Sequence, residues 1–520
     1  MTNRTILRTI ATSVAGSCLA YAQVDPSEDP HAAIKFLDIT GVAGFGDYSW
    51  PTNSGFGAGA NAVDFDNDGD IDIFLPRYEG TASQLYQNDG AGNFTEIAGQ
   101  IGLASTRGHR QALWFDYDND ADLDLITVGD CYQQTTCEGD RTIELFRQDS
   151  PTSFTEVGEA AGLGGTLTLS VYSHAAGMAA GDIDNDGDLD LYVCSWKDES
   201  RLFLNNGDGT FAEISATSGA GVRETNWQPV MSDFDGDGWL DIFVAVDFEP
   251  NYLFMNNRDG TFTDRAFEAG VDWIANDMGV AVGDYDNDRD MDLYVTNIYK
   301  DGYYNVLYRN DSNAGVPLFT ERAAEAGVDD GRWGWGATFF DADHDGWLDL
   351  ATTNGYRNAD WEDDQSKFWL NRGGADPNFT DVSAVVGYND TYWGAALVAF
   401  DCERDGDLDL LQTCSNGDPL LLLENQRHGR PRSWLVVQPR IDGPNYFAVH
   451  AQVRVTADGL TQTREISAGM SFLGQEPFEA HFGLPRSGGF ADVQIIWPDG
   501  TTKELRRVAR NQVLTVTKDQ

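Results

Sequence analysis

Basic residues are scarce in this chain. Its 520 residues include 34 Lys and Arg against 84 Asp and Glu, which gives a formal net charge of −50 at pH 7. Nucleic acids and acidic membrane surfaces carry charge of the same sign, so the field of such a protein repels them. We therefore expect neither nucleic acid nor an acidic membrane surface among its partners.

Histidines and the common catalytic motifs are also rare or missing. The chain has seven His, none of which forms a ligand pattern with a second, and we expect His344 to point to solvent. It contains no P-loop, no Gly-x-Gly-x-x-Gly, no Gly-x-Ser-x-Gly and no His-Glu-x-x-His. These absences favour a binding protein over an enzyme. A pair of carboxylates of the glycosidase type stays open as an alternative, because acidic residues are abundant.

No apolar run after the N-terminal region is long enough to span a bilayer. Residues 1–22 are predicted to be a signal peptide, because Arg4 and Arg8 precede a short apolar stretch that ends in Ala20-Tyr21-Ala22. The segment that ends at Cys18 weakly resembles a lipoprotein box, which leaves a lipid anchor as the alternative. We expect a secreted, cell-surface or periplasmic protein.

Cysteine is rare, with six residues in the whole chain. Cys131 and Cys137 lie close together in one predicted loop, and an oxidising compartment favours a disulfide between them. Cys194, Cys402 and Cys414 are predicted to be free. Cys194 falls in a predicted strand, where a thiol serves as a small buried side chain.

What the chain has in abundance is one acidic nonapeptide, Asp-x-Asp-x-Asp-Gly-x-x-Asp or a close variant, which occurs seven times. The copies follow one another at intervals of 51 to 66 residues. A repeat with such a period indicates a solenoid, a propeller or another array of equal units. The copies begin at Asp64, Asp116, Asp182, Asp233, Asp284, Asp341 and Asp401.

Each nonapeptide is predicted to bind one Ca²⁺, so that the chain holds up to seven. Carboxylates on alternate residues of a tight turn suit a hard cation, and Gly at the sixth position permits the turn. Without a cation the carboxylates repel one another, which argues against turns that are merely solvated. The predicted ligands, with the carbonyl of position seven included, are Asp64, Asp66, Asp68, Asp70 and Asp72; Asp116, Asp118, Asp120, Asp122 and Asp124; Asp182, Asp184, Asp186, Asp188 and Asp190; Asp233, Asp235, Asp237, Trp239 and Asp241; Asp284, Asp286, Asp288, Asp290 and Asp292; Asp341, Asp343, Asp345, Trp347 and Asp349; Asp401, Glu403, Asp405, Asp407 and Asp409.

These turns are not EF-hands, because an EF-hand closes with Glu at its twelfth position. No twelfth position in this chain is acidic, whereas the ninth position is Asp in every copy and closes the shorter loop. Three copies depart from the pattern, since Ala121 and Arg289 replace the turn Gly and Glu403 replaces the third-position Asp. The positive charge of Arg289 disfavours a cation at its site.

Strand patterns flank every turn, as in Ile71–Leu75 and Leu189–Val193. A second signature, Leu-Tyr-x-Asn followed by Phe-Thr-Glu, predicts further strands after each turn. Each unit then has about four strands, the size of a propeller blade. The last unit ends at Asn425 without Phe-Thr-Glu, and Phe36–Thr40 supplies the matching segment. We predict an all-β fold, a seven-bladed β-propeller whose N-terminal strand completes the last blade and covers its free edge.

The repeats resemble the FG-GAP or VCBS-type repeats of integrin alpha-chain propellers over residues 36–428. The resemblance implies calcium loops on one face, between the first and second strands of each blade, and partners on the opposite face. On that face we expect the aromatic residues that follow the second strands, Tyr78, Trp196, Phe248, Tyr299 and Tyr356. Nearby we expect Trp333, Trp335, Trp393, and the long connections 129–141 and 354–366, the second with Trp361. The alternative is that these aromatics pack beneath their own loops.

The composition changes in residues 430–520, which hold 11 Lys and Arg and 9 Asp and Glu. Strand patterns separated by turn signals continue there, and we predict a small separate β-domain. Phe482-Gly483-Leu484, Trp497-Pro498-Asp499-Gly500 and the segment that begins Arg464-Glu465-Ile466 resemble the ASPIC/UnbV domain of the cartilage acidic protein family.

These features together predict a secreted or surface calcium-binding propeller that mediates extracellular recognition of, or adhesion to, a protein or glycan. The alternative is an extracellular or periplasmic enzyme that acts on a polysaccharide or a secondary metabolite, because the resemblance includes members linked to enediyne biosynthesis. A deep channel with two unliganded carboxylates would favour the enzyme, and a flat aromatic face would favour binding.

Overall fold

Each acidic repeat forms the turn between the first two strands of a four-stranded antiparallel sheet, as the sequence predicts. In the first repeat, β2 (Ala60–Val63) ends just before Asp64, and β3 (Asp72–Leu75) begins at the closing Asp. Both strands are buried along their whole length, because neighbouring sheets cover them on either side. β4 (Gln84–Asn88) and β5 (Phe94–Glu96) complete the sheet.

The computed structural model describes residues 34–46, 48–50, 57–78, 80–129, 143–164, 174–300, 302–313, 315–356, 360–374, 378–427 and 432–518. The strands of the later repeats, in chain order, are β6 (His109–Phe115), β7 (Asp124–Gly129), β8 (Ile143–Ser150), β9 (Ser153–Glu156), β10 (His174–Gly181), β11 (Asp190–Glu199), β12 (Arg201–Asn205), β13 (Phe211–Glu213), β14 (Arg223–Ser232), β15 (Asp241–Pro250), β16 (Tyr252–Asn256), β17 (Phe262–Asp264), β18 (Ile274–Asn276), β19 (Val280–Gly283), β20 (Asp292–Val295), β21 (Val306–Asn310), β22 (Phe319–Glu321), β23 (Gly334–Phe340), β24 (Asp349–Asn354), β25 (Lys367–Asn371), β26 (Phe379–Asp381), β27 (Gly394–Phe400), β28 (Asp409–Cys414) and β29 (Leu421–Asn425).

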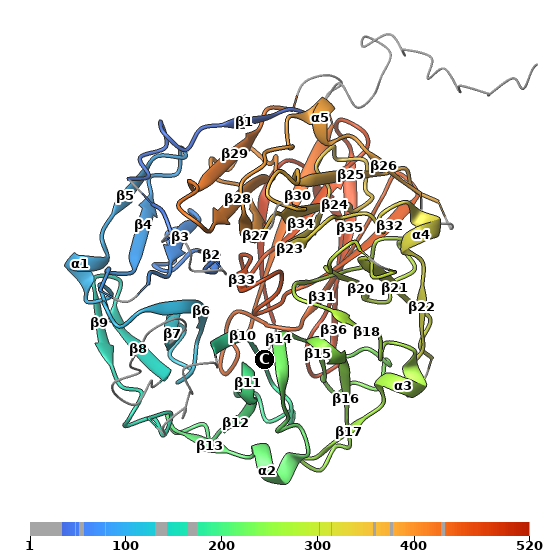
Figure 1. The fold of residues 1–520 in the computed structure, drawn as a ribbon. Helices are drawn as coiled ribbons and strands as arrows, with labels where there is room; N and C mark the ends of the chain where they lie inside the picture. Colours follow the sequence, from blue (N-terminus) through green and yellow to red (C-terminus); the bar gives the residue numbers. More distant parts are fainter. Residues whose placement is uncertain are drawn as a thin grey trace, which may run out of the picture.

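The sheets stand side by side around a common centre, as the blades of a propeller do (Figure 1). In the described part of the chain, the strand pairings define seven four-stranded sets, and a further pairing of β11 with β14 joins two of them. The first strand of each set, β2, β6, β10, β14, β19, β23 or β27, lies innermost. The all-β propeller predicted from the repeats is confirmed.

Short helices follow the outer strands and lie on the rim of the ring (Figure 1). They are α1 (Ala98–Ile101), α2 (Ser215–Ser218), α3 (Ala266–Ala269), α4 (Ala323–Ala326) and α5 (Ser383–Val386). Each ends at a Gly in the left-handed conformation, such as Gly102 at φ 95°. A Cβ at Gly102 would lie 2.8 Å from the Phe154 carbonyl oxygen of the next blade, so close packing also requires Gly there.

The N-terminal strand closes the ring. β1 (Phe36–Asp38) pairs antiparallel with β29 in the last blade. Phe36 is buried there against Phe340, Phe368 and Tyr388, with ring centroids 5.6 to 6.4 Å apart. The prediction that the N-terminal strand completes the last blade is confirmed.

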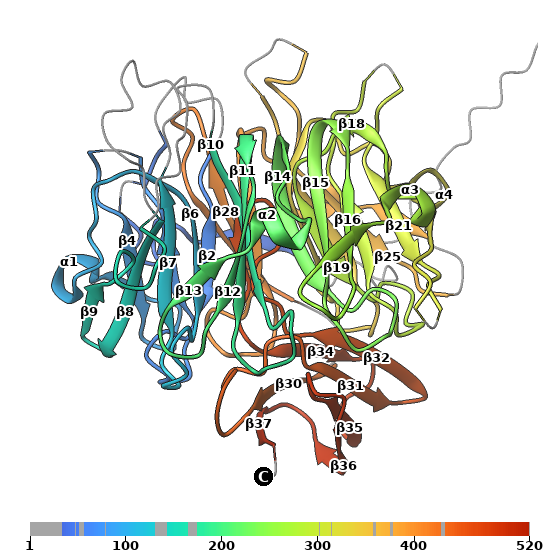
Figure 2. The same ribbon diagram turned by 90° about the horizontal axis from the view of Figure 1, so that it is seen from below.

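The C-terminal segment folds into two small sheets beneath the ring (Figure 2). In one sheet, β30 (Ser433–Arg440) lies between β34 (Ala480–Leu484) and β37 (Val513–Thr517). The other has the order β32 (Leu460–Glu465), β31 (Gln452–Ala457), β35 (Phe490–Ile496), β36 (Thr502–Ala509). The acidic turns of the second to seventh repeats all border this segment, so it covers the face that carries them.

This segment is less separate from the propeller than its composition suggests. Residues 467–476, which we call the central plug, leave the small sheets and enter the centre of the ring (Figure 1). The plug includes β33 (Gly474–Gln475), which pairs in parallel with β2. The backbone of Ser471 also exchanges two hydrogen bonds with Val280 of β19, at 2.7 and 2.8 Å.

Side chains extend the contacts of the plug to every inner strand. The Gln475 amide bonds both the N–H and the C=O of Trp114 in β6, each at 2.8 Å. Phe472 is fully buried, with its ring centroid 5.3 Å from that of Trp227 and 5.1 Å from that of Trp335. The remaining bonds join Ala468 to Ala180 in β10, Leu473 to Gln228 in β14, and Glu476 to Thr338 in β23 and Ala399 in β27.

Four predictions concern residues that the structure does not describe: the signal peptide 1–22, the lipid anchor at Cys18, the disulfide between Cys131 and Cys137, and the connection 129–141 beyond its first residue. Cys194, Cys402 and Cys414 are free and buried, as predicted. No helix in the described ranges is long and apolar enough to cross a bilayer.

Candidate metal centres and the opposite face

The acidic turns share one backbone conformation. In the first turn, Asn67 at the fourth position and Gly69 at the sixth have left-handed backbones, with φ of 57° and 97°. The same two positions have positive φ in all seven turns, and even Ala121 and Arg289 adopt it, at 72° and 90°. Asn tolerates this conformation better than most residues. The Asn at the fourth position of four turns is therefore a sequence signal that the carboxylate pattern alone does not include.

Backbone N–H groups hold the carboxylates of each turn in place. In the second turn, Asp116 accepts hydrogen bonds from the N–H groups of Asp120 and Ala121, at 3.1 and 3.0 Å. The closing Asp124 accepts from Tyr117 N–H at 3.1 Å and from Gln148 N–H of the third strand at 2.8 Å. The turn itself thus positions its first and last carboxylates.

Three carboxylates, from the first, third and ninth positions, converge in each of the first four turns. In the first turn, one oxygen each of Asp64, Asp66 and Asp72 lies within 4.8 Å of the others. Each also has a buried oxygen without a hydrogen-bond partner, which is costly unless a cation or a proton is supplied. Equivalent groups are Asp116, Asp118 and Asp124; Asp182, Asp184 and Asp190; Asp233, Asp235 and Asp241.

The fifth-position carboxylates, which are also predicted ligands, are not part of these groups. Asp68 is exposed, and it accepts a hydrogen bond from the N–H of Asp70 at 3.0 Å. At the seventh position, Trp239 and Trp347 likewise donate their N–H groups to Asp237 and Asp345. In the first four turns the structure therefore brings together the first, third and ninth residues, and the fifth lies outside the group.

Burial and mutual repulsion raise the pKa values of these carboxylates. The pKa of Asp64 rises from 3.8 to about 6 and that of Asp72 to about 9, chiefly through burial and further through the charges of neighbouring carboxylates. The same causes raise the pKa of Asp190 and Asp292 well above its ordinary value. A divalent cation at the centre of each group would offset both effects, so the residues present fit Ca²⁺.

An Asn at the end of the third strand links each blade to the one before it. Asn256 donates through Nδ2 to Leu240 O of its own turn at 3.1 Å and to Ile183 O of the preceding turn at 2.7 Å. Gln148 takes this role in the second blade, where its amide nitrogen reaches Phe65 O and Leu123 O. The corresponding residues elsewhere are Asn88, Asn205, Asn310, Asn371 and Asn425. This contact explains the Asn of the Leu-Tyr-x-Asn signature.

The fourth residue of a turn reaches in the other direction, to the next turn. Asn185 Nδ2 donates to Gly238 O at 3.2 Å, and Asn287 Nδ2 donates to Gly346 O at 3.0 Å. Arg404 Nε donates to Gly69 O at 2.8 Å and so joins the last turn to the first. Neighbouring turns are therefore coupled twice, once through the third strand and once directly.

The aromatic residues predicted for the opposite face fall into two classes. Phe248 and Tyr299 are 56% and 40% exposed, whereas Tyr78 and Tyr356 are half-buried and Trp196 is buried. Phe248 also has a positive φ of 75°, which costs energy for an aromatic residue and is typical of functional sites. Only part of the predicted ring faces solvent, and the packing alternative holds for Trp196.

Blades six and seven carry a stacked aromatic group on this face. Trp333 stacks on Tyr356 with ring centroids 4.2 Å apart and planes at 20°. Trp361 meets Trp333 edge-on at 4.7 Å, and Trp393 lies 6.4 Å from Tyr356. Trp335 lies between Trp333 and Phe472, so the central plug supports the group from within the ring.

Family models match both parts of the chain. The FG-GAP-like repeat model matches residues 64–127, 182–244 and 233–295, each of which contains two acidic turns. The ASPIC and UnbV model matches residues 441–520. This chain carries FG-GAP-like repeats and an ASPIC and UnbV domain.

This chain has curated relatives named cartilage acidic protein 1. It is 24% identical to the Xenopus tropicalis protein over 358 residues and 27% identical to the Homo sapiens protein over 357 residues. Each match covers 67% of this chain, but 46% and 50% of the relatives. The chain thus spans about half the length of the curated relatives it matches.

Solved structures with a similar fold include BBS1N in complex with ARL6DN, at a TM-score of 0.41 and 11% identity, covering 76% of this chain and 98% of that one. The BP39L lectin from Burkholderia pseudomallei matches with a TM-score of 0.42 and 12% identity, covering 72% of this chain and 98% of the lectin.

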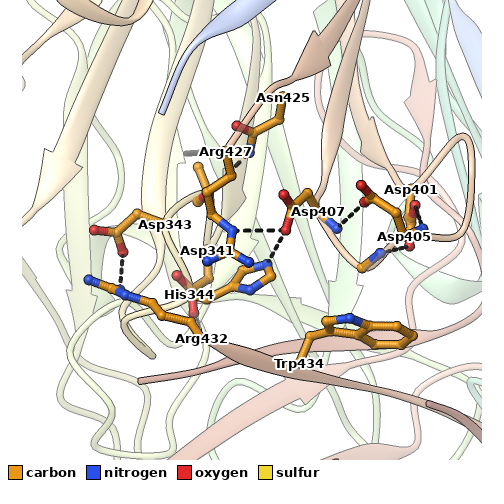
Figure 3. Close-up of polar contacts among 12 residues, drawn as sticks. Asp341, Asp343, His344, Asp401, Asp405, Asp407, Asn425, Arg427, Arg432 and Trp434 are labelled. Atoms are coloured by element: carbon orange, nitrogen blue, oxygen red, sulfur yellow. Dashed lines mark hydrogen bonds and ion pairs between the residues drawn. The ribbon is translucent and has the colours of Figure 1, made fainter. Parts of the chain in front are cut away.

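Three residues that precede the ASPIC and UnbV domain, Arg427, Arg432 and Trp434, border the sixth and seventh turns (Figure 3). Arg432 Nη1 donates to Asp343 Oδ1 at 2.9 Å, and Arg427 Nε donates to Asp407 Oδ1 at the same distance. Trp434 lies so close to Gly406 that a Cβ there would fall 2.0 Å from the indole ring. These two turns are therefore shielded from solvent by protein.

The expectation that His344 points to solvent is wrong. Its side chain is fully buried, and its Nε2 lies 3.4 Å from Asp407 Oδ1 in the seventh turn (Figure 3). His344 occupies the fourth position, whose side chain reaches the next turn, and Gly483 of β34 covers it. Burial lowers the pKa of His344 well below its ordinary value, so the imidazole is neutral.

The fifth and seventh turns differ most from the consensus. Arg289 lines a cleft with Arg454 of β31, so its charge faces the C-terminal region. In the seventh turn, Glu403 Oε2 lies 2.7 Å from Cys402 Sγ, and these two residues form the convergent group with Asp409. The seventh turn thus retains three converging ligand atoms but replaces one carboxylate with a thiol.

A hydroxyl, an imidazole and a carboxylate line up between the first two blades. Ser83 Oγ lies 3.1 Å from His109 Nδ1, and His109 Nε2 lies 2.6 Å from Glu144 Oε2. The order is that of a nucleophile, its base and an orienting acid, which the sequence does not reveal because the three residues are far apart. All three are buried, and Glu144 also binds Ser105 and Arg107. We interpret the group as a structural contact between blades.

Proposed function

We propose that this protein is an extracellular calcium-binding propeller that recognises a protein or glycan through the face opposite its ASPIC and UnbV domain. One observation carries the calcium part of the proposal: carboxylates from the first, third and ninth positions converge in turn after turn, and in the first turn each of the three has a buried oxygen without a hydrogen-bond partner. Similarity to cartilage acidic protein 1 supports the extracellular part. The net charge of −50 argues against nucleic acid as the partner.

Calcium binding is tested on the intact chain after dialysis against a chelator. Calorimetric titration is expected to show several Ca²⁺ bound per chain, up to seven, and binding weaker for Mg²⁺, which resists losing its water ligands. Each site adds roughly 1.4 kcal/mol when free Ca²⁺ is about ten times Kd. The melting temperature should therefore fall sharply in chelator and recover with Ca²⁺.

A matched pair of variants assigns the effect to the turns. Asp190→Asn removes a buried ninth-position carboxylate, whereas Asp208→Asn changes an exposed carboxylate in the same blade. The first variant should bind one Ca²⁺ fewer, and the second should match the parent. An identical melting curve with and without chelator, together with no heat of Ca²⁺ binding, would overturn the proposal.

The partner is proposed to dock on the aromatic face. Phe248 and Tyr299 are large exposed side chains at equivalent positions of the repeat in adjacent blades, and the stacked group of Trp333 and Tyr356 lies on the next blade. Aromatic rings that are rigid and partly exposed are common at recognition sites for proteins, and they also stack on sugar rings. No membrane surface is needed for this docking.

A glycan and secreted-protein array with the purified chain identifies the partner class. Phe248→Ser is expected to weaken binding to any hit, whereas Phe267→Ser changes an even more exposed Phe on α3 at the outer rim and serves as the control. Equal binding by both variants would place the contact elsewhere.

The enzyme alternative acting on a polysaccharide or secondary metabolite has one specific observation behind it, the Ser83, His109 and Glu144 arrangement. Because Ser83 is buried, we expect a fluorophosphonate probe to leave it unlabelled. Labelling that is lost in Ser83→Ala would favour the enzyme.

A further inference from the structure

A cavity lies where the central plug leaves the ring and meets the small C-terminal sheets. Its volume is about 100 Å³. Its walls come from the inner strands of blades four to seven on one side and from residues 464–481 on the other. Cavities at such junctions, mostly apolar with a few converging polar groups, are typical small-molecule sites.

Three of the charged groups in the wall have their partners already, and one of them, Asp341, accepts hydrogen bonds from the N–H groups of Asp345 and Gly346. Glu465 binds His450 Nδ1 at 3.0 Å and Ser232 Oγ at 3.0 Å, one with each carboxylate oxygen. Glu479 binds Arg404 Nη1 at 2.6 Å and Gln438 Nε2 at 3.0 Å in the same way. These two carboxylates have little capacity left for a ligand.

Three other groups retain capacity. Arg464 donates to Thr463 O and Gln462 Oε1, which uses two of the five N–H donors of its guanidinium. Glu476 receives its two hydrogen bonds, from Thr338 and Ala399, on the same oxygen. The cavity therefore offers a cation with free donors and a carboxylate with a free oxygen.

His481 supplies a third group, an acceptor. Its Nε2 lies 2.8 Å from the carbonyl oxygen of Gly406, so Nε2 carries the hydrogen and donates it. In the neutral ring Nδ1 is then an acceptor, and this atom is buried without any hydrogen-bond partner. The side chain is 9% exposed and lines the cavity. A buried acceptor without a donor indicates that a molecule with N–H or O–H groups belongs there.

The rest of the wall is apolar and sets the size of the occupant. Phe339, Phe400 and Met470 are among the buried residues that line the cavity. An engineered protein cavity of about 150 Å³ holds benzene, so a cavity of about 100 Å³ admits only an occupant of smaller volume than benzene.

We propose that this cavity binds a small zwitterion, an α-amino acid with a short apolar side chain. The carboxylate of the ligand binds the Arg464 guanidinium, and its ammonium group donates to Glu476 and to His481 Nδ1. The methyl or similar side chain contacts the aromatic wall. Because the ligand touches the propeller and the C-terminal region at once, it strengthens their docking. The cavity borders the sixth calcium turn, because Asp341 lines it and the Arg464 guanidinium interacts with the charges of Asp341 and Asp284. It is separate from the aromatic face in the proposed function.

The test uses the intact calcium-loaded chain, with L-alanine as the probe and its two halves, ethylamine and propionate, as matched fragments. Calorimetry and thermal unfolding are expected to show binding and stabilisation by alanine and neither effect for the fragments. Arg464→Met and Glu476→Gln should each weaken alanine binding by about tenfold or more, or ~1.4 kcal/mol. Arg454→Met is the control, because Arg454 lies on the neighbouring strand and lines a different cleft.

Saturation-transfer NMR on the unmodified chain covers the case in which a variant fails to fold. Transfer to the alanine methyl group is expected, because that group contacts the apolar wall. Absence of transfer and of heat would mean that the cavity holds water alone and would overturn the proposal. Equal binding of propionate and alanine would also overturn it, since a simple anion site needs no ammonium partner.

Discussion

At the scale of single residues, the Asn that ends each third strand has the largest structural effect for its size. One amide group of Asn256 satisfies a carbonyl in its own turn and a carbonyl in the turn of the preceding blade. Both carbonyls lie in the buried layer between blades, where water cannot replace the donor. The Asn recurs at the same place in each repeat because these buried carbonyl groups need a hydrogen-bond donor.

Asn256→Ala is therefore expected to lower the free energy of unfolding by about 2 kcal/mol or more, because two buried carbonyl groups lose their donor. Urea unfolding in excess Ca²⁺ measures the change. Asn257→Ala is the control, since Asn257 is exposed and bonds only within its own hairpin. That variant should stay within about 0.5 kcal/mol of the parent. Equal losses in both would show that the link between blades contributes nothing.

The carboxylates of the turns make a pH prediction at the same scale. Burial raises the pKa of Asp64 to about 6, of Asp116 to about 7 and of Asp401 to about 8, from an ordinary value of 3.8. The folded metal-free protein thus keeps protons that the unfolded chain has lost, and its stability falls as pH rises through these values.

In chelator, the melting temperature is expected to fall steadily between about pH 5 and pH 8. In excess Ca²⁺ the ligated carboxylates are ionised in the folded state, so stability should instead be retained at high pH and lost as pH falls. A melting temperature that rises with pH in chelator would contradict the assignment of these pKa values.

At the scale of elements, β1 closes the ring. Its Phe36 inserts between aromatic side chains of blade six and blade seven, while the next residue, Leu37, is 41% exposed. One strand of three residues thus provides both the backbone pairing and the apolar anchor that join the two ends of the propeller.

Phe36→Ala is expected to lower the free energy of unfolding by about 3 to 5 kcal/mol, the usual cost of removing a buried aromatic side chain. Leu37→Ala should have little effect, because this side chain faces solvent. Chemical unfolding and size-exclusion chromatography follow the outcome, with aggregation of the Phe36 variant expected from its loosened edge strand. If the two variants unfold alike, the N-terminal strand is not the closure.

At the scale of the whole molecule, the central plug joins the C-terminal region to every blade. Ser471, Gln475 and Glu476 bond inner strands from five blades that are far apart in the sequence. Two domains connected only by a linker would unfold independently, but this arrangement makes each depend on the other.

The intact calcium-loaded chain is therefore expected to unfold in a single calorimetric transition. A chain that ends at residue 427 loses the plug, leaves Trp227 and Trp335 without Phe472, and should melt at a lower temperature. Phe472→Ala should show part of the same loss. Two well-separated transitions in the intact chain would contradict this coupling.

Much of the fold was predictable because it depends on short sequence patterns that repeat along the chain. The turn carboxylates, the flanking apolar strands and the split last unit each depend on short segments, and Phe36 could be matched to its counterparts by type alone. His344 could not be placed in this way, because its burial depends on the next turn and on Gly483. The cavity near His481 could not be predicted from the sequence either, because its wall combines strands from four blades with a distant segment.

The sequence by itself determined the repeating unit, the positions of the carboxylates and the closure of the ring, because these depend on residues near one another in the chain or on repetition. Only the tertiary structure decided which carboxylates converge, which aromatics face solvent and where the C-terminal region lies. Those outcomes depend on contacts between segments hundreds of residues apart, such as Gln475 with Trp114. Burial and hydrogen-bond geometry select such contacts, and no local pattern records them.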